Sequence, residues 1–185
     1  MKIKVRPSIC IFLLVSFLLS SCKLPGLIPL NSLPTMEKDA DVLIEVLNGE
    51  DWIPLLVLAP EQYTEEDYSK PGTLTFSPVV TNEKPVYFSY GWCTVDEETL
   101  KQNFEHITVE ISLNGDVLGS DVVHSLSFGR SDGLVCVDLG VLFSDWPPGA
   151  YTLMAVATFD EKINDGLADY AAGDYVFIYE ISVNE

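Results

Sequence analysis

Basic residues are scarce in this 185-residue chain, which has 10 Lys and Arg against 28 Asp and Glu and a formal net charge of −18 at pH 7. The chain after position 21 is more acidic still, because Lys2, Lys4 and Arg6 are the only charged residues before that point, so 7 basic and 28 acidic residues leave −21. A field of this sign repels phosphate backbones. We therefore expect no nucleic acid partner.

Histidine is almost absent, with only His106 and His124. Neither lies at zinc-ligand spacing from a cysteine, which argues against a zinc site. The chain has no Gly-x-Ser-x-Gly motif, and His124 is merely next to Ser125. A Ser-His-Asp hydrolase is therefore disfavoured.

The apolar run from Ile9 to Leu19 is too short to cross a bilayer, since it covers about 11 residues and a spanning helix needs about 20. It follows three basic residues, a combination typical of a secretory signal peptide. We expect residues 1–21 to be an export signal.

The run ends in Leu19-Ser20-Ser21-Cys22, which resembles the lipobox of bacterial lipoproteins. The resemblance implies that a peptidase cuts before Cys22 and that the sulfur of this residue carries a diacylglycerol. Two acyl chains, at about 0.8 kcal/mol per buried methylene, hold a protein firmly where one chain binds reversibly. An ordinary signal peptide, in which Cys22 has no such role, is the alternative.

The resemblance also implies a location. Lys23, rather than Asp, follows the cysteine, which favours the outer leaflet in a cell with two membranes. We expect a lipid-anchored, extracytoplasmic protein of the cell envelope, in the outer membrane or on the outer face of the plasma membrane. A proline-rich composition predicts a stiff lipidated tether over residues 22–36. The remaining residues 37–185 are enough for one domain.

Four cysteines are present, and two of them are not expected to be available for a disulfide in the domain. Cys10 leaves with the signal peptide and Cys22 carries the lipid, which leaves Cys93 and Cys136 in an oxidising compartment. We predict a disulfide between them, and closure of a loop of this size stabilises the fold by about 4 kcal/mol in the chain-entropy model. Two free buried thiols are the alternative.

Alternation with a period of two residues predicts β-strands. Apolar residues alternate with polar ones over Ile107–Leu113, and Asn114-Gly115 then predicts a type I′ hairpin. Similar patterns occur at 85–93, 133–140, 150–159 and 174–183, and the last predicts a central strand because both of its faces are largely apolar. The long helices that parallel βαβ units need are missing, so the strands predict an antiparallel sandwich.

The segments NGDVLGSDVV and WPPGAYTLMAVATF resemble elements of bacterial immunoglobulin-like domains. The resemblance implies a mainly β fold, an antiparallel immunoglobulin-like β-sandwich with one or two short helices. It concerns architecture only, since Trp92 directly precedes Cys93 and antibody-type domains place the core tryptophan well after the first cysteine.

Two short segments are candidates for helices. Thr94 and Glu97 have capping-box spacing and predict a helix that covers one end of the sandwich. Residues 37–48 fit either a helix or a strand, and we favour the helix.

The acidic segment after residue 159 raises the question of calcium. Asp160, Asn164, Asp165 and Asp169 offer the oxygen ligands that this ion prefers. Their spacing does not fit an EF-hand, so an acidic hairpin loop is favoured. We predict no metal site and no cofactor, with these four residues as weak candidates only.

These observations predict an exported, lipid-anchored surface protein that acts as an interaction or structural module and not as an enzyme. Its partners are the membrane, through the lipid, and a protein or polysaccharide. A carbohydrate-binding module is the alternative, with Trp52, Trp92 and Trp146 as candidate stacking platforms, although such residues more often pack in the core. A small hydrolase is the third hypothesis.

Replacing Cys22 by Ser tests the anchor. We expect the variant to lack the lipid mass on its N-terminus and to leave the membrane fraction, because the thioether can no longer form. Mass spectrometry of the N-terminal peptide measures this, and Cys10→Ser is the control that should keep the lipid. A wild-type chain with an unmodified terminus at any residue other than 22 would contradict the prediction.

Overall fold

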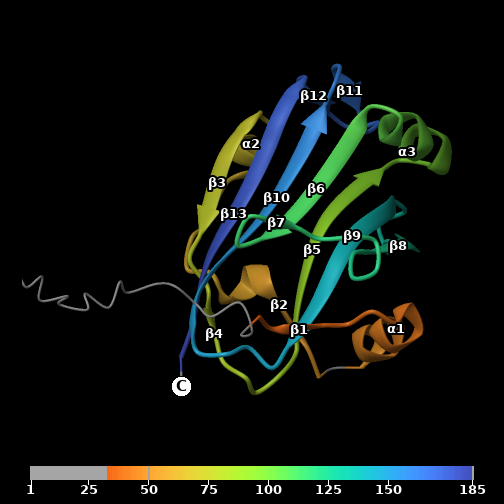
Figure 1. Ribbon diagram of the computed structural model, residues 1–185. Coiled ribbons are helices and arrows are strands. Elements are labelled where there is room, and N and C mark those ends of the chain that lie inside the picture. The colour runs from red at the N-terminus through yellow and green to blue at the C-terminus, as the bar shows by residue number, and fades with distance from the viewer. Residues whose placement is uncertain (1–32, 50, 185) are drawn as a thin grey trace, which may run out of the picture.

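Two β-sheets face each other and enclose the main core (Figure 1). The structure, a computed structural model, describes residues 33–49 and 51–184. Strands dominate these residues, so the protein is mainly β, as the sequence predicts. A small two-stranded sheet lies at the end of the molecule where α3 is found (Figure 1).

The first sheet has the order β1 (Thr35–Met36), β9 (Val135–Ser144), β5 (Val86–Thr94) and β2 (Ile53–Pro54), and β8 (His124–Gly129) also pairs with β9. The second has the order β3 (Gly72–Phe76), β13 (Gly173–Val183), β10 (Gly149–Phe159), β6 (Ile107–Leu113) and β7 (Asp116–Val117), and β4 (Val79–Val80) also pairs with β13. The small sheet contains β11 (Ile163–Asn164) and β12 (Asp169–Tyr170). The helices are α1 (Ala40–Asn48), the 3-10 helix η1 (Leu55–Leu58), α2 (Glu65–Tyr68) and α3 (Glu97–Phe104).

Both large sheets are mixed, which corrects the expectation of purely antiparallel pairing. The long strands β5, β9, β10 and β13 pair antiparallel with their long neighbours. At the edges, β3 and β4 run parallel to β13, and β2 runs parallel to β5. None of these short strands is joined to its partner by a hairpin, so no tight turn forces the two directions to be opposite.

Aromatic side chains connect the two sheets through the core. Phe88 of β5 meets Tyr179 of β13 edge-on, with ring centroids 5.3 Å apart, and Phe76 of β3 stacks on the same tyrosine at 4.7 Å. Trp146, in the connection before β10, is 1% exposed and packs against Phe143. Large buried rings of this kind contribute much of the apolar area that holds two layers together.

The predicted hairpin is confirmed. Asn114 and Gly115 have φ angles of 53° and 87°, the positive values that a type I′ turn needs, and they join β6 to β7. Asn114 also connects the turn to β10. Its main-chain N–H donates to the carbonyl oxygen of Thr152 at 2.7 Å, and its Oδ1 accepts from the N–H of Thr152 at 2.9 Å. The strand predicted to be central, β13, lies between β10 and β3.

Helix α1 covers the outer face of the first sheet. Asp39 is its N-cap, and the carboxylate accepts hydrogen bonds from two main-chain amides of the first turn. Leu43 is fully buried against Tyr87 and Leu142. The helical interpretation of residues 37–48 is therefore confirmed for Ala40–Asn48, while residues 37–39 precede the helix.

Three α-helices occur in the described residues, where one or two were expected. Helix α3 begins at Glu97, but its N-cap is Asp96 and not Thr94. Thr94 is the last residue of β5, and its hydroxyl donates to the carbonyl oxygen of Asp96. Strand β1 begins at Thr35, inside the tether expected over residues 22–36, so sheet pairing starts before the predicted domain boundary.

The predicted disulfide between Cys93 and Cys136 is present. The two residues lie directly opposite each other in β5 and β9, with their Cα atoms 4.1 Å apart. The bridge therefore joins two neighbouring strands of one sheet. In antibody domains the corresponding bridge joins the two sheets.

The close packing of β9 against Tyr87 yields a stability prediction. A Cβ atom on Gly140 would overlap the phenol ring and hydroxyl of Tyr87, whose side chain is held between α1 and the sheet. We expect Gly140→Ala to lower the free energy of unfolding by about 1–3 kcal/mol, the usual cost of overpacking. Urea denaturation measures this. Gly129→Ala in β8 is the control, since a Cβ there meets nothing within 4 Å, and equal stability losses in both variants would contradict the prediction.

Candidate functional site

A groove follows β5 along the side on which the first sheet ends. It consists of three adjoining cavities of about 300, 160 and 220 Å³. The first and second share Tyr90 and the second and third share Phe88, so they form one depression that begins at Trp92 and ends at Trp52. We call it the β5 groove; its main aromatic residues are Tyr68, Phe88, Tyr90, Trp92, Tyr170 and Phe177.

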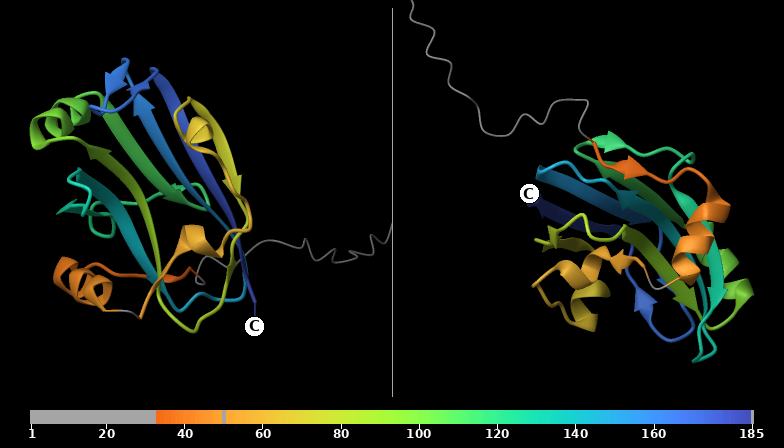
Figure 2. Two further views of the ribbon diagram at one scale, coloured as in Figure 1. Left: turned by 180° about the vertical axis from the view of Figure 1, so that it is seen from behind. Right: turned by 90° about the horizontal axis from the view of Figure 1, so that it is seen from below.

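Helices α2 and η1 border the β5 groove. Helix α2 lies over β3 and β13, and η1 lies beside β5 (Figure 2, left). Tyr68, at the end of α2, is 36% exposed and stacks on Phe177 of β13, with ring centroids 6.2 Å apart and planes at 20°. Leu56 of η1 is exposed and lines the second and third cavities. Tyr68 of α2 and Leu56 of η1 therefore both line the second cavity, together with Ser89 and Gly91 of β5.

The Trp92 end of the groove is formed by rings that also belong to the core. Trp92 of β5 contacts Tyr170 of β12 at 4.8 Å and Phe159 of β10 at 5.3 Å, both edge-on. Phe159 packs in turn against Tyr175 at 4.4 Å. Because these rings are fixed by core packing, the surface that they offer is preformed.

Several hydrogen-bond donors lie in this end of the groove. Trp92 is buried, and its Nε1 has no hydrogen-bond partner in the described residues. Burial raises the pKa of Tyr170 to about 12 and also raises the pKa of Tyr90. Both phenols are therefore protonated at neutral pH. An unpaired buried donor such as the indole N–H is destabilising until an acceptor reaches it.

The charged residues at the groove have opposite signs. Arg130 lies at the Trp92 end and forms an ion pair with Asp132 at 2.8 Å. Toward the other end, the carboxylate of Asp138 occupies the space that a side chain on Gly91 would need. Burial raises the pKa of Asp138, while a hydrogen bond with the Ser89 side chain opposes this shift. A cation brought close to Asp138 would stabilise its charged form.

The weak calcium candidates are engaged with protein donors. Asp165 is buried, and its Oδ1 accepts from the main-chain amides of Leu167 and Ala168, each at 2.7 Å. Its Oδ2 accepts from the hydroxyl of Tyr170 at 3.0 Å. Asp165 therefore closes its own turn and also orients a ring of the β5 groove.

The other three candidates are also engaged within the protein, and two of them bond to each other. Asp169 accepts from Lys162 Nζ at 2.7 Å and from Asn164 Nδ2 at 2.8 Å. Asp160 lies 2.9 Å from His106. The four residues do not converge on one centre, and within residues 33–49 and 51–184 no cluster of three or more His, Cys, Asp or Glu could hold a metal ion.

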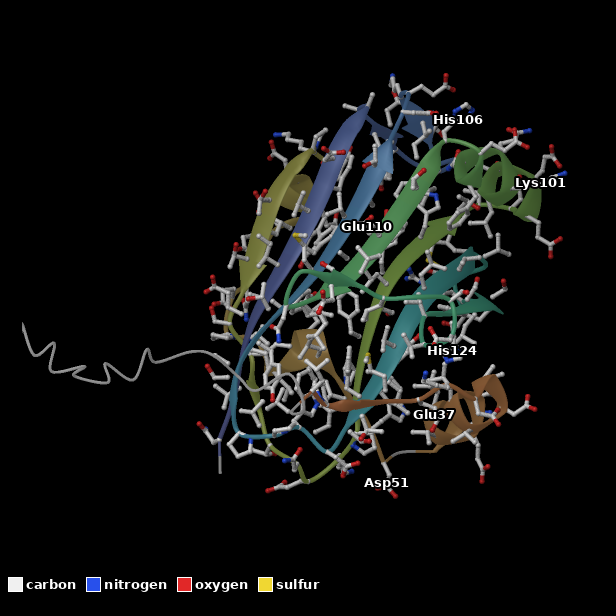
Figure 3. All side chains as sticks on the ribbon, viewed as in Figure 1. Glu37, Asp51, Lys101, His106, Glu110 and His124 are labelled. Atoms are coloured by element: carbon white, nitrogen blue, oxygen red, sulfur yellow. A yellow bond between two sulfur atoms is a disulfide. The ribbon has the colours of Figure 1, made fainter. Side chains whose placement is uncertain are left out.

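The two histidines lie apart from each other and from the groove (Figure 3). His106 lies at the start of β6, and its Nδ1 hydrogen bond with Asp160 raises the pKa of the imidazole. His124 lies near α1, with its Nε2 3.1 Å from the carbonyl oxygen of Glu37. In the described part of the chain, no hydrogen bond joins either ring to a serine, threonine or tyrosine hydroxyl.

The three tryptophans do not form an exposed row. Trp92 and Trp146 are buried, and Trp52 is half-buried, with its ring 5.6 Å from Tyr87 and its Nε1 donating to the carbonyl oxygen of Leu47 at 3.2 Å. The exposed ring of the groove is Tyr68, which sequence reasoning did not single out. The eight tyrosines were noted as a group, but no pattern in the sequence distinguishes this one.

Cys22 and the rest of the proposed signal and lipobox lie outside the described residues. Among the residues that the structure does describe, no helix has the length and apolar character to span a membrane.

No protein-family model and no curated protein matches the sequence. Among solved structures, the chain is similar to one in "Structure of PbICP-C in complex with falcipain-2", with a TM-score of 0.38 and 8% identity. The match covers 72% of this chain and 99% of that chain. A likeness this distant supports no conclusion about fold or function.

The bonds of Asp165 lead to a prediction about the acidic loop. We expect Asp165→Ala to lower the free energy of unfolding by about 1–3 kcal/mol, because two amides and a tyrosine hydroxyl lose their acceptor. We expect 1 mM calcium, the upper end of roughly 10⁻⁴ to 10⁻³ M for weak extracellular sites, to leave the wild-type melting temperature unchanged. Glu161→Ala is the control in the same loop. Micromolar calcium binding that is lost in Asp165→Ala would contradict this structural role.

Proposed function

We propose that the protein is a lipid-anchored, extracytoplasmic binding module whose β5 groove holds its ligand. The anchor rests on the lipobox-like Leu19-Ser20-Ser21-Cys22 segment. The disulfide supports a location outside the cytoplasm, since such bridges persist in oxidising compartments. The module acts by holding a protein or polysaccharide partner at the surface of the cell envelope.

The observation that carries the binding function is the shape and lining of the β5 groove. Its largest cavity has a volume of about 300 Å³, at the lower end of the range for ligand sites, and aromatic side chains dominate its walls. Trp92, which lines this cavity, has a buried indole N–H with no hydrogen-bond partner among the described residues. Concave, mostly apolar surfaces with a few polar groups are the usual form of a binding site.

We also propose that this module is not an enzyme. The histidines lie outside the groove, and the buried carboxylate of Asp165 is fully used by donors of its own loop. These arrangements support binding over acid–base chemistry. A small hydrolase stays the third hypothesis.

For the architecture, we propose a variant of the immunoglobulin-like sandwich. Two facing sheets with antiparallel long strands support this relationship. The variant differs in its parallel edge strands and in a disulfide that stays within one sheet.

A carbohydrate-binding module is the second candidate. The stacked pair of Tyr68 and Phe177 favours it, because the exposed ring could stack on a sugar. Trp92 and Trp146 give it less support than the sequence suggested, since both are buried.

Tyr68→Ala tests the groove as a binding site. The probes are a displayed library of random heptapeptides and a panel of linear hexasaccharides, each applied to the full chain in detergent. We expect at least one probe to bind and its affinity to fall at least about tenfold in Tyr68→Ala, which corresponds to one lost aromatic contact. Phe128→Ala, at a 45% exposed ring on β8, is the control and should bind normally. If no probe binds, or if the two variants bind alike, the proposal fails.

A further inference from the structure

Strand β5 has one free edge. On one side it pairs with β9 from Val86 to Thr94. On the other side it pairs only with β2, where Ile53 and Pro54 lie opposite Val86 and Tyr87. After Pro54 the chain turns into η1. In the described part of the chain, the position next to β5 therefore has no strand beyond Tyr87.

The pairing with β9 determines which main-chain groups lie on this edge. Cys93 and Cys136 are directly opposite, and their Cα separation of 4.1 Å is that of a non-hydrogen-bonded antiparallel pair. The N–H and C=O of Cys93 therefore point away from β9. By alternation, those of Gly91 and Ser89 do the same. No main-chain hydrogen bond among the described residues uses these groups.

These free donors and acceptors lie within the β5 groove. Ser89, Gly91 and Cys93 all line it, between the rings of Tyr68 and Phe177 on one side and the Asp138 carboxylate on the other. From Ser89 to Cys93 the edge extends for about 13 Å, with donor–acceptor pairs repeating every two residues. An extended peptide carries the same groups at the same spacing, whereas a sugar chain does not.

We propose that an extended peptide segment of a partner protein adds to the free edge of β5 as an extra strand, with alternate side chains inserted into the β5 groove. This inference rests on the proposed function of the groove and names its ligand class. The added strand occupies the position beside β5 that β2 occupies only as far as Pro54. Strand addition of this kind obtains affinity from main-chain hydrogen bonds and selectivity from pockets for alternate side chains.

Charge selects the kind of peptide. Glu65 and Glu66 are exposed in α2, near Tyr68, and Asp138 lies beside Gly91. Glu66 is paired with Lys70, which leaves Glu65 as the carboxylate of α2 open to a partner. Residues 22–185 carry a net charge of −21. We therefore expect a segment with apolar or aromatic residues at alternate positions and Lys or Arg nearby. The same net charge disfavours a second copy of this chain as the added strand, because two strongly acidic chains repel each other.

The test begins with heptapeptides selected from a displayed random library against the full chain in detergent. Two matched variants are compared. Ser89→Pro removes an outward N–H from β5 that the sheet does not use, and edge strands tolerate proline at such positions. Ser127→Pro does the same on β8, where Leu126 and Phe128 are the residues bonded to β9, so that the N–H of Ser127 points outward. The outer edge of β8 does not border the β5 groove. We expect Ser89→Pro to weaken the selected peptide at least about tenfold and Ser127→Pro to leave it unchanged.

A second measurement does not depend on the variants folding. In the wild-type protein, the amides of Ser89, Gly91 and Cys93 should exchange with solvent rapidly, and bound peptide should slow their exchange at least about tenfold, as followed by NMR. The selected peptides should be basic and alternating, and the complex should contain one copy of the chain by sedimentation.

The outcomes separate this inference from the proposed function. Peptide binding that leaves these three amides unprotected overturns strand addition. Binding of hexasaccharides but not peptides, sensitive to Tyr68→Ala, overturns it while the groove stays a binding site. A complex that contains two copies joined through β5 identifies self-association instead and also overturns it. If neither probe class binds, both proposals fail together.

Discussion

The pairing of β5 with β9 is the constraint on which the core and the groove both depend. The disulfide between Cys93 and Cys136 fixes opposite residues of the two strands. In this register Phe88 and Trp92 face the second sheet, while Ser89 faces the outer side. A slip of one residue would exchange the two faces of β5, so that its large rings would leave the core. The same register decides which main-chain groups lie on the free edge.

The groove is an extension of the core and not a separate structure placed on it. Trp92 and Phe159 belong to the smaller core cluster and also line the groove, so the contacts that stabilise the fold also hold the proposed binding surface in place. Asp165 connects the acidic loop to this surface through Tyr170. Rigid walls of this kind reduce the ordering cost of binding, because few side chains have to be immobilised when the ligand arrives.

Much of the fold could be predicted because its signals are local. Asn114-Gly115 determines a turn by its own backbone preference, and the two remaining cysteines could be paired by elimination. The parallel strands could not be predicted, since Leu74 lies opposite Phe177 across about 100 residues of chain and no local pattern encodes that pairing.

The groove also depends on contacts between segments far apart in the sequence. It exists because the chain turns away from β5 after Pro54 and places Tyr68 over Phe177. The acidic loop shows the opposite limit, because its composition left a weak calcium site open and only the structure shows that main-chain amides bind the carboxylate of Asp165.

The free edges of the first sheet affect the tendency of neighbouring copies to aggregate if many copies are anchored to one membrane. Both β5 and β8 present an unpaired side, and open edges are the usual starting point for strand-to-strand aggregation. Lipid anchors would confine the molecules to two dimensions and raise their encounter frequency. Residues 22–185 carry a net charge of −21. Electrostatic repulsion between two copies acts over a Debye length of about 8 Å at physiological ionic strength, a distance at which two edges would begin to pair. On the proposed lipid-anchored arrangement, the acidity of the chain would keep neighbouring copies apart while the edges stay open to the proposed basic partner.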